Sequence, residues 1–311
     1  MRLVVDKGLI KEFYREVINN SSFLAGKGFD DVGLVFLASR KKYYPQLVQP
    51  YITSGEVLRR EIVHFENENE FIKKIKRLDL DEECFTVRLK HPDGRAVKSI
   101  DELPENVREF VEKYEPRIET CYEKTYRTKC LVMNIPKETM AIYISLSLHN
   151  TVKAGMDFVS ALNRLIYQLI RVDNEFEYVA SDPNEVIRKR GEILKNFTRN
   201  HIKYLSELHK ASKNSFVLVD IDSQDEEVLI NTLQIIKENT GSSPVWITRT
   251  HGGYHLIFDP YSELLKFLFR DLKKKVESIG FQSDVIEIKK KAMTPVPGTL
   301  QGNFLVRRYK L

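Results

Sequence analysis

The chain has 311 residues, of which 42% are apolar and 30% are charged, a balance typical of water-soluble globular proteins. No apolar run approaches the roughly 18 residues of a membrane-spanning helix, and Arg2, Asp6 and Lys7 bring charge too early for a secretory signal, so we expect a cytoplasmic protein without membrane contact. The 49 basic and 44 acidic residues give a formal net charge of +5, which is too small to predict nucleic-acid binding by itself.

The first part of the chain predicts an α/β unit. Apolar spacing predicts helices over 7–20 and 70–78, and apolar runs predict strands over 32–38, 60–65 and 84–90. The last of these strands ends at His91-Pro92-Asp93-Gly94, a strong turn signal. A polar stretch follows over 99–116. We therefore divide the chain into an N-terminal accessory unit, residues 1–105, and a second domain, residues 106–311.

The middle of the chain carries elements without a clear chemical motif. We expect a helix over 103–114, strands over 130–134 and 140–147, and a helix over 152–170 whose apolar residues have the spacing of a buried face. Residues 184–210 predict a long helix. Eight basic residues and two acidic ones lie between 188 and 213, which fits a solvated helix face and a surface for a polyanion equally well.

The cysteines predict neither a disulfide framework nor a zinc ribbon. Cys84, Cys121 and Cys130 are odd in number and form no C-x-x-C pair. Cys121 and Cys130 could bind a metal together with His149, but small thiols in a reducing compartment are the favoured interpretation.

From residue 216 onward the order of elements predicts a particular sheet. Strands are expected over 216–221, 245–249, 254–258, 284–288 and 303–309, with helices over 225–239 and 261–278. A βαββαβ order is the ferredoxin-like, or RRM-like, split pattern, which forms an antiparallel sheet with two helices on one face. We therefore predict an α+β fold in which the other face of this sheet is open.

Two carboxylates end the first of these strands. Because successive side chains of a strand point to opposite faces, Asp220 and Asp222 are expected to lie side by side. Adjacent anions repel unless a cation lies between them, and hard oxygen ligands suit Mg²⁺ or Mn²⁺. An isolated Asp-x-Asp is more often a solvated strand end, so the pair needs further support.

That support comes from the residues that follow. Gly252 and Gly253 allow a tight turn or a close backbone approach before the strand that carries His255. Alone, these residues would indicate a hairpin and a hydrogen-bonded histidine. Further along lie the acidic residues Asp284 and Glu287, the basic run Lys289 to Lys291, and the turn Pro297-Gly298-Thr299.

In this order the motifs resemble the archaeo-eukaryotic primase superfamily, which includes primase-polymerases of plasmids, phages and mobile elements. Asp220 and Asp222 match its first motif, an apolar strand that ends in Asp-x-Asp. Its second motif, a small residue two positions before a histidine, is matched by Gly253 and His255. The resemblance covers the C-terminal two thirds of the chain, with the motifs in residues 216–302.

The third motif of the family is an apolar residue followed by an acid. Asp284 matches it first, and Glu287 is the alternative. The chain departs from the family at Gly253, where serine is frequent, and at Ser147-Leu148-His149-Asn150, where a strand often ends in Asn-Pro-Arg. No role is carried over to that last segment.

The resemblance implies template-directed nucleotidyl transfer by a DNA primase or DNA polymerase that uses two Mg²⁺ or Mn²⁺ ions. Asp220 and Asp222 would hold both ions, Asp284 or Glu287 would complete the metal site, and His255 would bond a phosphate. The other candidates for nucleotide binding are Arg249, Gly252, Gly253, Lys291, Arg307 and Arg308. The expected partners are a single-stranded DNA template with its primer, an NTP or dNTP, and a helicase or other replication or repair protein.

Two other functions are compatible with the same residues. A metal-dependent nuclease would use the same acids and histidine. A catalytically inactive primase-like subunit would bind single strands through its basic patches and would bind no nucleotide. The acid pair argues against the inactive subunit, because uncompensated acids facing DNA would weaken binding.

Overall fold

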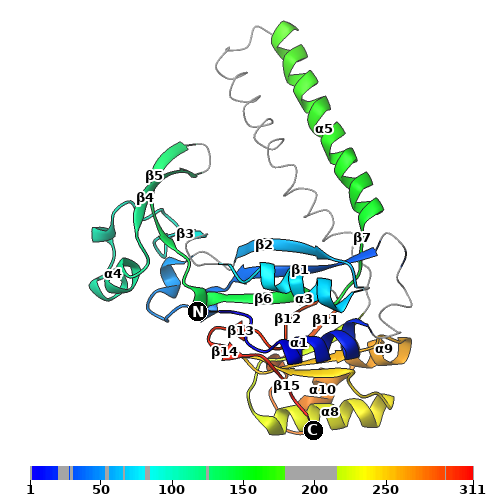
Figure 1. Cartoon of the computed structure of the whole chain (residues 1–311). Helices are drawn as coiled ribbons and strands as arrows, with labels where there is room; N and C mark the ends of the chain where they lie inside the picture. The colour runs from blue at the N-terminus through cyan, green and yellow to red at the C-terminus, as the bar shows by residue number, and fades with distance from the viewer. Residues whose placement is uncertain are drawn as a thin grey trace.

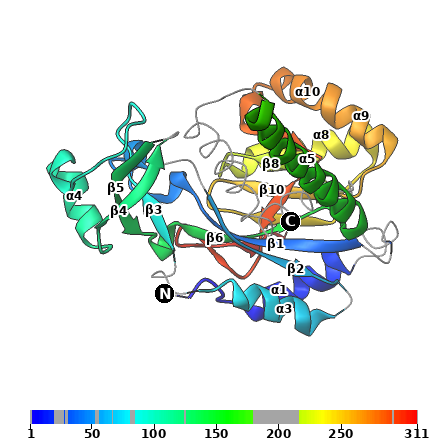
Figure 2. The ribbon, with the colours of Figure 1, turned by 90° about the horizontal axis from the view of Figure 1, so that it is seen from above.

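The computed structural model describes residues 2–19, 28, 31–52, 56–65, 67–80, 85–123, 126–178, 216–290 and 292–310. The described residues form a mixed α+β structure with three antiparallel sheets, of seven, five and three strands. The seven-stranded and five-stranded sheets face each other, and the three-stranded sheet lies at one end of the molecule (Figures 1 and 2).

The seven-stranded sheet has the order β14-β13-β6-β1-β2, and two further strands, β12 and β7, pair with β6 and β1. Its strands are β1 (Asp31–Ser39), β2 (Glu56–Val63), β6 (Met140–Ser145), β7 (His149–Asn150), β12 (Met293–Pro295), β13 (Leu300–Gln301) and β14 (Phe304–Leu305). All nine residues of β1 are buried, which explains its nearly continuous apolar run. The division of the chain at residue 105 remains a prediction, and this sheet takes strands from both sides of that position.

Two helices and the central strands share one core. The helices α1 (Lys7–Phe13) and α3 (Glu68–Arg77) place Phe13 and Phe71 in a cluster with Val35 and Ile142 of the seven-stranded sheet. Asp6 and Asn67 cap the N-termini of the two helices through their side chains. The helix predicted over 7–20 is α-helical in α1 and continues as a π-helix over Tyr14–Ile18. The helix predicted over 70–78 and the strands over 32–38 and 140–147 are confirmed, with small shifts of their ends.

The five-stranded sheet has the order β11-β8-β10-β9-β15, and every neighbouring pair is antiparallel. Its strands are β8 (Val217–Ile221), β9 (Trp246–Arg249), β10 (Tyr254–Phe258), β11 (Ile286–Lys289) and β15 (Arg307–Arg308). The helices α8 (Glu226–Thr240), α9 (Ser262–Arg270) and α10 (Leu272–Ser278) cover one face of it (Figure 1). The side chains of Val219 and Ile221 pack into that helical layer, because alternate residues of a strand share a face.

The predicted elements of this region are confirmed with three differences. The helix expected over 261–278 ends at Arg270 and a second helix begins at Leu272. The strand expected over 284–288 begins at Ile286, because residues 283–285 form a turn of 3₁₀-helix. The strand expected over 303–309 is divided between two sheets as β14 and β15.

The second face of the five-stranded sheet is not open, contrary to the prediction from the sequence. Leu218, Trp246 and Ile257 point to this face and are at most 1% exposed. They belong to the same core cluster as the first sheet, and the ring of Phe13 meets that of Trp246 edge-on at 5.4 Å. These large apolar side chains are covered by the first sheet and its helices, and the polar end of this face, at Asp220, borders a cavity.

The turn at Pro297-Gly298-Thr299 is hydrogen-bonded to the N-terminal segment of the chain. The backbone N–H groups of Val5 and Asp6 donate to the carbonyl oxygen of Gly298. Gly298 has a φ of +86°, and a Cβ at this position would lie 2.1 Å from the carbonyl oxygen of Asp6. Glycine is therefore required by the close approach of the N-terminal segment.

The three-stranded sheet projects from the rest of the molecule. It contains β3 (Thr86–Arg88), β4 (Arg117–Glu123) and β5 (Tyr126–Asn134), with α4 (Glu105–Glu112) beside it. The sequence did not predict β4. Cys121 and Cys130 are free and buried here, whereas His149 lies in β7 at the opposite end of the molecule and bonds Ser145 at 2.9 Å (Figure 1). These three side chains therefore form no metal site.

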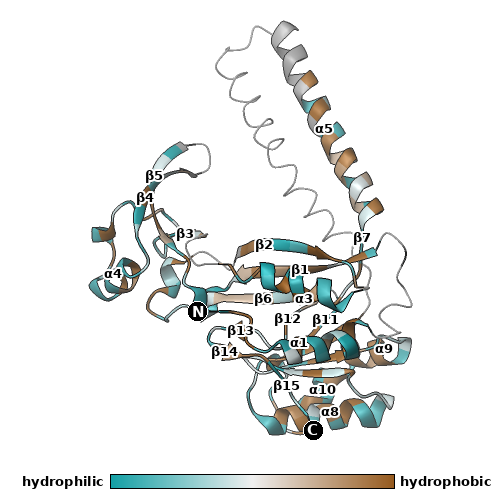
Figure 3. Ribbon diagram, in the orientation of Figure 1, coloured by the Kyte–Doolittle hydropathy of each residue, from teal (hydrophilic) through white to brown (hydrophobic). Residues whose placement is uncertain are grey.

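The longest helix extends away from both sheets. α5 (Thr151–Tyr178) confirms the predicted helix over 152–170, but several of its described apolar side chains are exposed where burial was expected, including Met156 at 67% and Val159 at 54%. The ribbon of this helix projects beyond the two larger sheets (Figures 1 and 3). The helix predicted over 184–210 and its basic residues lie outside the described residues. Over the part of the chain that is described, no helix combines the length and apolarity needed to cross a bilayer.

A buried ion pair fixes the N-terminal segment to the core. The ammonium of Lys137 lies 3.0 Å from Oδ1 of Asp79, and both side chains are at most 10% exposed. The same carboxylate accepts hydrogen bonds from the backbone N–H groups of Leu3 and Val4 at 2.9 and 3.2 Å. Removing the ammonium would therefore leave a buried carboxylate with backbone donors only.

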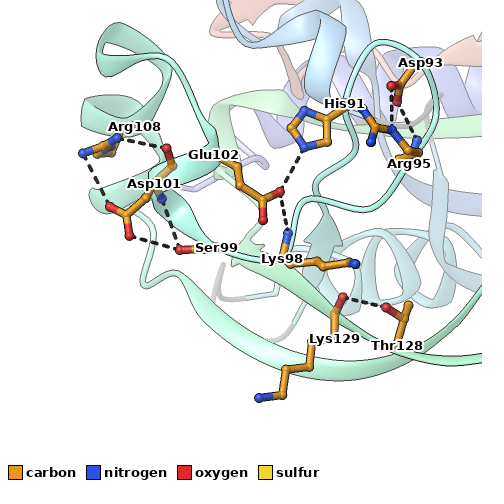
Figure 4. Close-up of polar contacts among 10 residues, drawn as sticks. All are labelled: His91, Asp93, Arg95, Lys98, Ser99, Asp101, Glu102, Arg108, Thr128 and Lys129. Atoms are coloured by element: carbon orange, nitrogen blue, oxygen red, sulfur yellow. Dashed lines mark hydrogen bonds and ion pairs between the residues drawn. The ribbon is translucent and has the colours of Figure 1, made fainter.

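We predict that Lys137→Met lowers the free energy of unfolding by about 3 kcal/mol, because it leaves Asp79 buried without its counter-ion. Urea unfolding followed by circular dichroism measures this change. Arg95→Met is the control, since Arg95 pairs with Asp93 in an exposed loop (Figure 4). The free energy of unfolding of the control should equal that of the parent chain. Equal losses in the two variants would contradict the role of the buried pair.

Candidate functional site

Asp220 is the centre of a hydrogen-bonded cluster at the end of β8. Antiparallel pairing places His255 of β10 directly opposite Asp220, and Nε2 of the ring lies 3.1 Å from Oδ1 of the carboxylate. The ammonium of Lys289, from β11 on the other side, lies 2.7 Å from Oδ2. Both carboxylate oxygens therefore have a protein partner, although Asp220 is only 8% exposed.

The surroundings of Asp220 favour its ionised form. Burial opposes ionisation, but the hydrogen bonds and charges of His255 and Lys289 outweigh burial and hold the pKa of Asp220 below its ordinary value. The reciprocal effect acts on Lys289. Burial would lower its pKa, yet the hydrogen bonds to Asp220 and Glu287 raise the pKa of Lys289 above the ordinary value.

The hydrogen bonds of His255 assign its tautomer. An ionised Asp220 only accepts hydrogen bonds, so the proton of the ring is assigned to Nε2. The other nitrogen, Nδ1, lies 2.9 Å from the hydroxyl of Thr294, which donates to it when the ring is neutral. Both ring nitrogens are thus engaged, and His255 orients the carboxylate of Asp220. A contact between His255 and a phosphate remains a prediction.

The two candidates for the third acid lie in different places. Glu287 of β11 is paired with Asp220 across the sheet, so the two side chains share a face. Oε2 of Glu287 lies 2.8 Å from the ammonium of Lys289, which therefore bridges two acids. Asp284 lies in the 3₁₀ turn before β11 and is exposed. The register thus brings Glu287, and not Asp284, next to Asp220.

A cavity of about 220 Å³ opens beside this cluster, where the two larger sheets meet. It is lined by Arg40, Lys42, Tyr143, Asp220, Asp222, Thr250, His255, Lys289, Ala292, Met293 and Gln301. Asp220 and Asp222 contribute two carboxylates, and Arg40, Lys42 and Lys289 contribute three cations. With the histidine counted as neutral, these three cations and two carboxylates give the lining a formal charge of +1. This charge suits a polyanion that binds together with a metal ion.

The predicted glycines shape the rim of this cavity. A Cβ on Gly253 would lie 2.0 Å from the carbonyl oxygen of Ile221, so glycine is needed for the turn to pass the end of β8. A Cβ on Gly252 would lie 3.4 Å from Oδ1 of Asp222 and 3.6 Å from Nζ of Lys42. The glycine turn thus lies against both the second acid and one of the cations.

Of the cations predicted from the C-terminal part, Arg249, Arg307 and Arg308 lie outside this cavity. Arg249 is paired with Tyr254 and Arg307, and these positions point to the helix-covered face, away from Asp220. The guanidinium of Arg308 is bound by two glutamates of the N-terminal segment, Glu12 and Glu16, and lies 4.4 Å from the centre of the Trp246 ring. Lys291 lies outside the described residues.

The cations that do line the cavity were not predicted as site residues. Arg40 and Lys42 follow β1 and are about 180 positions before Asp220 in the sequence. In the sequence, the feature that could have marked them as site residues is the basic run Arg40-Lys41-Lys42 after an apolar strand. Lys289 was recognised as part of a basic cluster, but the alternation of side chains in β11 decides that it shares a face with Asp220.

The carboxylates of the cavity are candidate ligands for a divalent ion. Among the described residues, no three His, Cys, Asp or Glu side chains converge as a metal-binding group. Asp220 and Asp222 nevertheless line one cavity. Proteins normally bind Mg²⁺ through one or two carboxylates, and water and substrate phosphates are its other ligands. The pair therefore fits a nucleotide-bound metal by donor chemistry.

Comparison with known proteins gave no match to a protein-family model, to a curated protein or to a solved structure.

We predict that Asp220→Asn destabilises the protein at neutral pH and much less in acid. The pKa of Asp220 is lower in the folded than in the unfolded chain, so its stabilisation is complete above the unfolded pKa of about 4 and is lost as the pH falls through the folded pKa. At pH 7 we expect a loss of about 2 kcal/mol, the order of hydrogen bonds to a charged group.

Urea unfolding of both proteins from pH 7 down to pH 3 measures the difference. The exposed Asp222 provides the matched control, and Asp222→Asn should show a small change at every pH. A loss for Asp220→Asn that stays constant over this range would show that the ionised carboxylate is not the stabilising species.

Proposed function

We propose that this protein catalyses template-directed nucleotidyl transfer, as a DNA primase or DNA polymerase. The observation that carries the proposal is the cavity in which Asp220 and Asp222 lie with Arg40, Lys42 and Lys289. Paired acids suit a divalent ion, and grouped cations suit a triphosphate. The proposed partners are a single-stranded DNA template with its primer, an NTP or dNTP and a replication or repair protein such as a helicase, and the proposed compartment is the cytoplasm.

The arrangement of the five-stranded sheet supports an RRM-like, or ferredoxin-like, catalytic sheet. Its first four strands along the chain are β8, β9, β10 and β11, with helices after β8 and β10. In space they have the order β11-β8-β10-β9, all antiparallel, which is the order of a split βαβ repeat. This order brings the acids of β8 between the histidine of β10 and the acid of β11.

In the proposed reaction, Asp220 and Asp222 would hold Mg²⁺ or Mn²⁺. When bound, the ions activate the attacking 3′-hydroxyl and neutralise charge on the triphosphate. His255 keeps Asp220 oriented, since its Nε2–H donates to one carboxylate oxygen and its Nδ1 is fixed by Thr294.

Arg40 and Lys42 are proposed to bind the triphosphate. Arg40 presents a planar fork that fits phosphate oxygens, and it lies 5.6 Å from the centre of the Tyr143 ring, which limits its orientations. Lys42 is exposed, and it lines the same cavity as Asp222. Both residues reach the acids from the other sheet, so substrate would bind between the sheets.

The double variant Asp220→Ala, Asp222→Ala should abolish extension of a labelled primer on a DNA template, tested with NTPs and dNTPs in Mg²⁺ and in Mn²⁺. Circular dichroism checks that the variant is folded. Shortening of the labelled strand by the parent chain would favour the nuclease, and salt-dependent DNA binding without either reaction would favour the inactive subunit. Extension by the variant at the parent rate would refute a role for the acid pair.

Lys42→Met should raise the KM for the nucleotide about ten-fold, because one of the charge-assisted phosphate contacts is lost while the apolar stem is kept. Steady-state primer extension gives this value. Lys41→Met is the matched control, since Lys41 is adjacent in sequence but does not line the cavity. A KM that changes equally in the two variants would indicate a general effect of surface charge.

A further inference from the structure

Lys289 holds the place where a metal ion would be expected. Its ammonium lies 2.7 Å from Oδ2 of Asp220 and 2.8 Å from Oε2 of Glu287. The remaining oxygen of Asp220 accepts from His255. In the structure as it stands, one side-chain cation therefore bridges two acids that lie opposite each other on β8 and β11.

An ammonium and a divalent ion compete for such a carboxylate. Like charges at contact distance repel strongly where water is partly excluded, so a metal that binds Oδ2 of Asp220 would repel the ammonium of Lys289. The histidine is less affected, because it binds the other carboxylate oxygen, Oδ1. Lys289 is thus the partner of Asp220 that a metal would expel.

The position of Lys289 allows this exchange. Its backbone is fixed, since it pairs with Leu218 as the last residue of β11. Its side chain is 33% exposed and lines the cavity. Rotation about the bonds of its flexible four-carbon stem can therefore move the ammonium from the acids into the cavity. Arg40 and Lys42 reach the same cavity from the opposite sheet.

We propose that Lys289 is an exchangeable counter-ion: a divalent ion displaces its ammonium from Asp220 and Glu287, and the released ammonium binds a phosphate oxygen of the nucleotide. The inference rests on the proposed function for the identity of the phosphate ligand. Lys289 then suppresses metal binding before the nucleotide arrives and strengthens nucleotide binding afterwards. An ion pair that only stabilises the fold would do neither.

The first test measures Mn²⁺ binding without nucleotide, by electron paramagnetic resonance of the free ion. Lys289→Met should bind Mn²⁺ about ten-fold more tightly than the parent chain, because the competing charge is removed. Lys290→Met is the matched control, since the ammonium of Lys290 lies over the Phe269 ring at 4.7 Å and touches neither acid. The gain should disappear when Asp220→Asn is added.

The second test measures the binding of inorganic triphosphate in saturating Mn²⁺ by calorimetry. Lys289→Met should bind it about ten-fold more weakly than the parent chain does, because one charged phosphate contact is lost. Lys289→Arg retains the charge and should keep Mn²⁺ affinity close to that of the parent, which also controls for folding. Circular dichroism of each variant accompanies both measurements.

The outcomes separate this inference from the proposed function. Unchanged or weaker Mn²⁺ binding by Lys289→Met would overturn the exchange, even if the parent chain extends primers. Tighter Mn²⁺ binding with weaker triphosphate binding, in a chain that extends no primer, would support the exchange and overturn nucleotidyl transfer. Tighter Mn²⁺ binding with unchanged triphosphate binding would overturn the second half of the proposal.

Discussion

The ionised carboxylate of Asp220 is the constraint around which the site is organised. It is nearly buried, and an isolated charge there would be costly, so the strands on either side each supply a partner. His255 comes from β10 and Lys289 from β11, while Thr294, just beyond β11, fixes the histidine in turn. The antiparallel register of these three strands therefore places the groups that compensate the charge of Asp220 beside it.

The same carboxylate lies at the junction of the two larger sheets. β11 leads through a short connection into β12, so the chain passes from the five-stranded sheet into the seven-stranded one beside Lys289. Leu218 and Ile257, on the same face as Asp220, belong to the core of both sheets. Apolar packing thus holds the sheets together at one end of this face and leaves a polar cavity at the other.

Local patterns predicted much of this arrangement. Period-two alternation in β8 and β10 correctly indicated which residues lie on one face with Asp220, and the split βαβ order indicated the neighbours of β8. The glycine at position 253 was predicted as a turn, and the structure explains it by the close passage of Ile221.

Other parts could not be read from local sequence. The sequence left Asp284 and Glu287 as alternatives for the third acid, because the boundary between the 3₁₀ turn and β11 has no signal that decides which of them shares a face with Asp220. Arg40 and Lys42 reach the cavity through long-range packing of a sheet whose strands lie far apart in the chain. The apolar stripe of α5 resembled a core face, yet the helix extends past the sheets that would have buried it.

A crystal structure of the protein with Mn²⁺ and triphosphate, with the ion located by its anomalous scattering, tests the proposed site most directly. We expect Mn²⁺ bound to Asp220 and Asp222, with phosphate oxygens near Arg40 and Lys42. An anomalous signal elsewhere, with Lys289 still bound to Asp220 and the cavity free of phosphate, would contradict the proposed site.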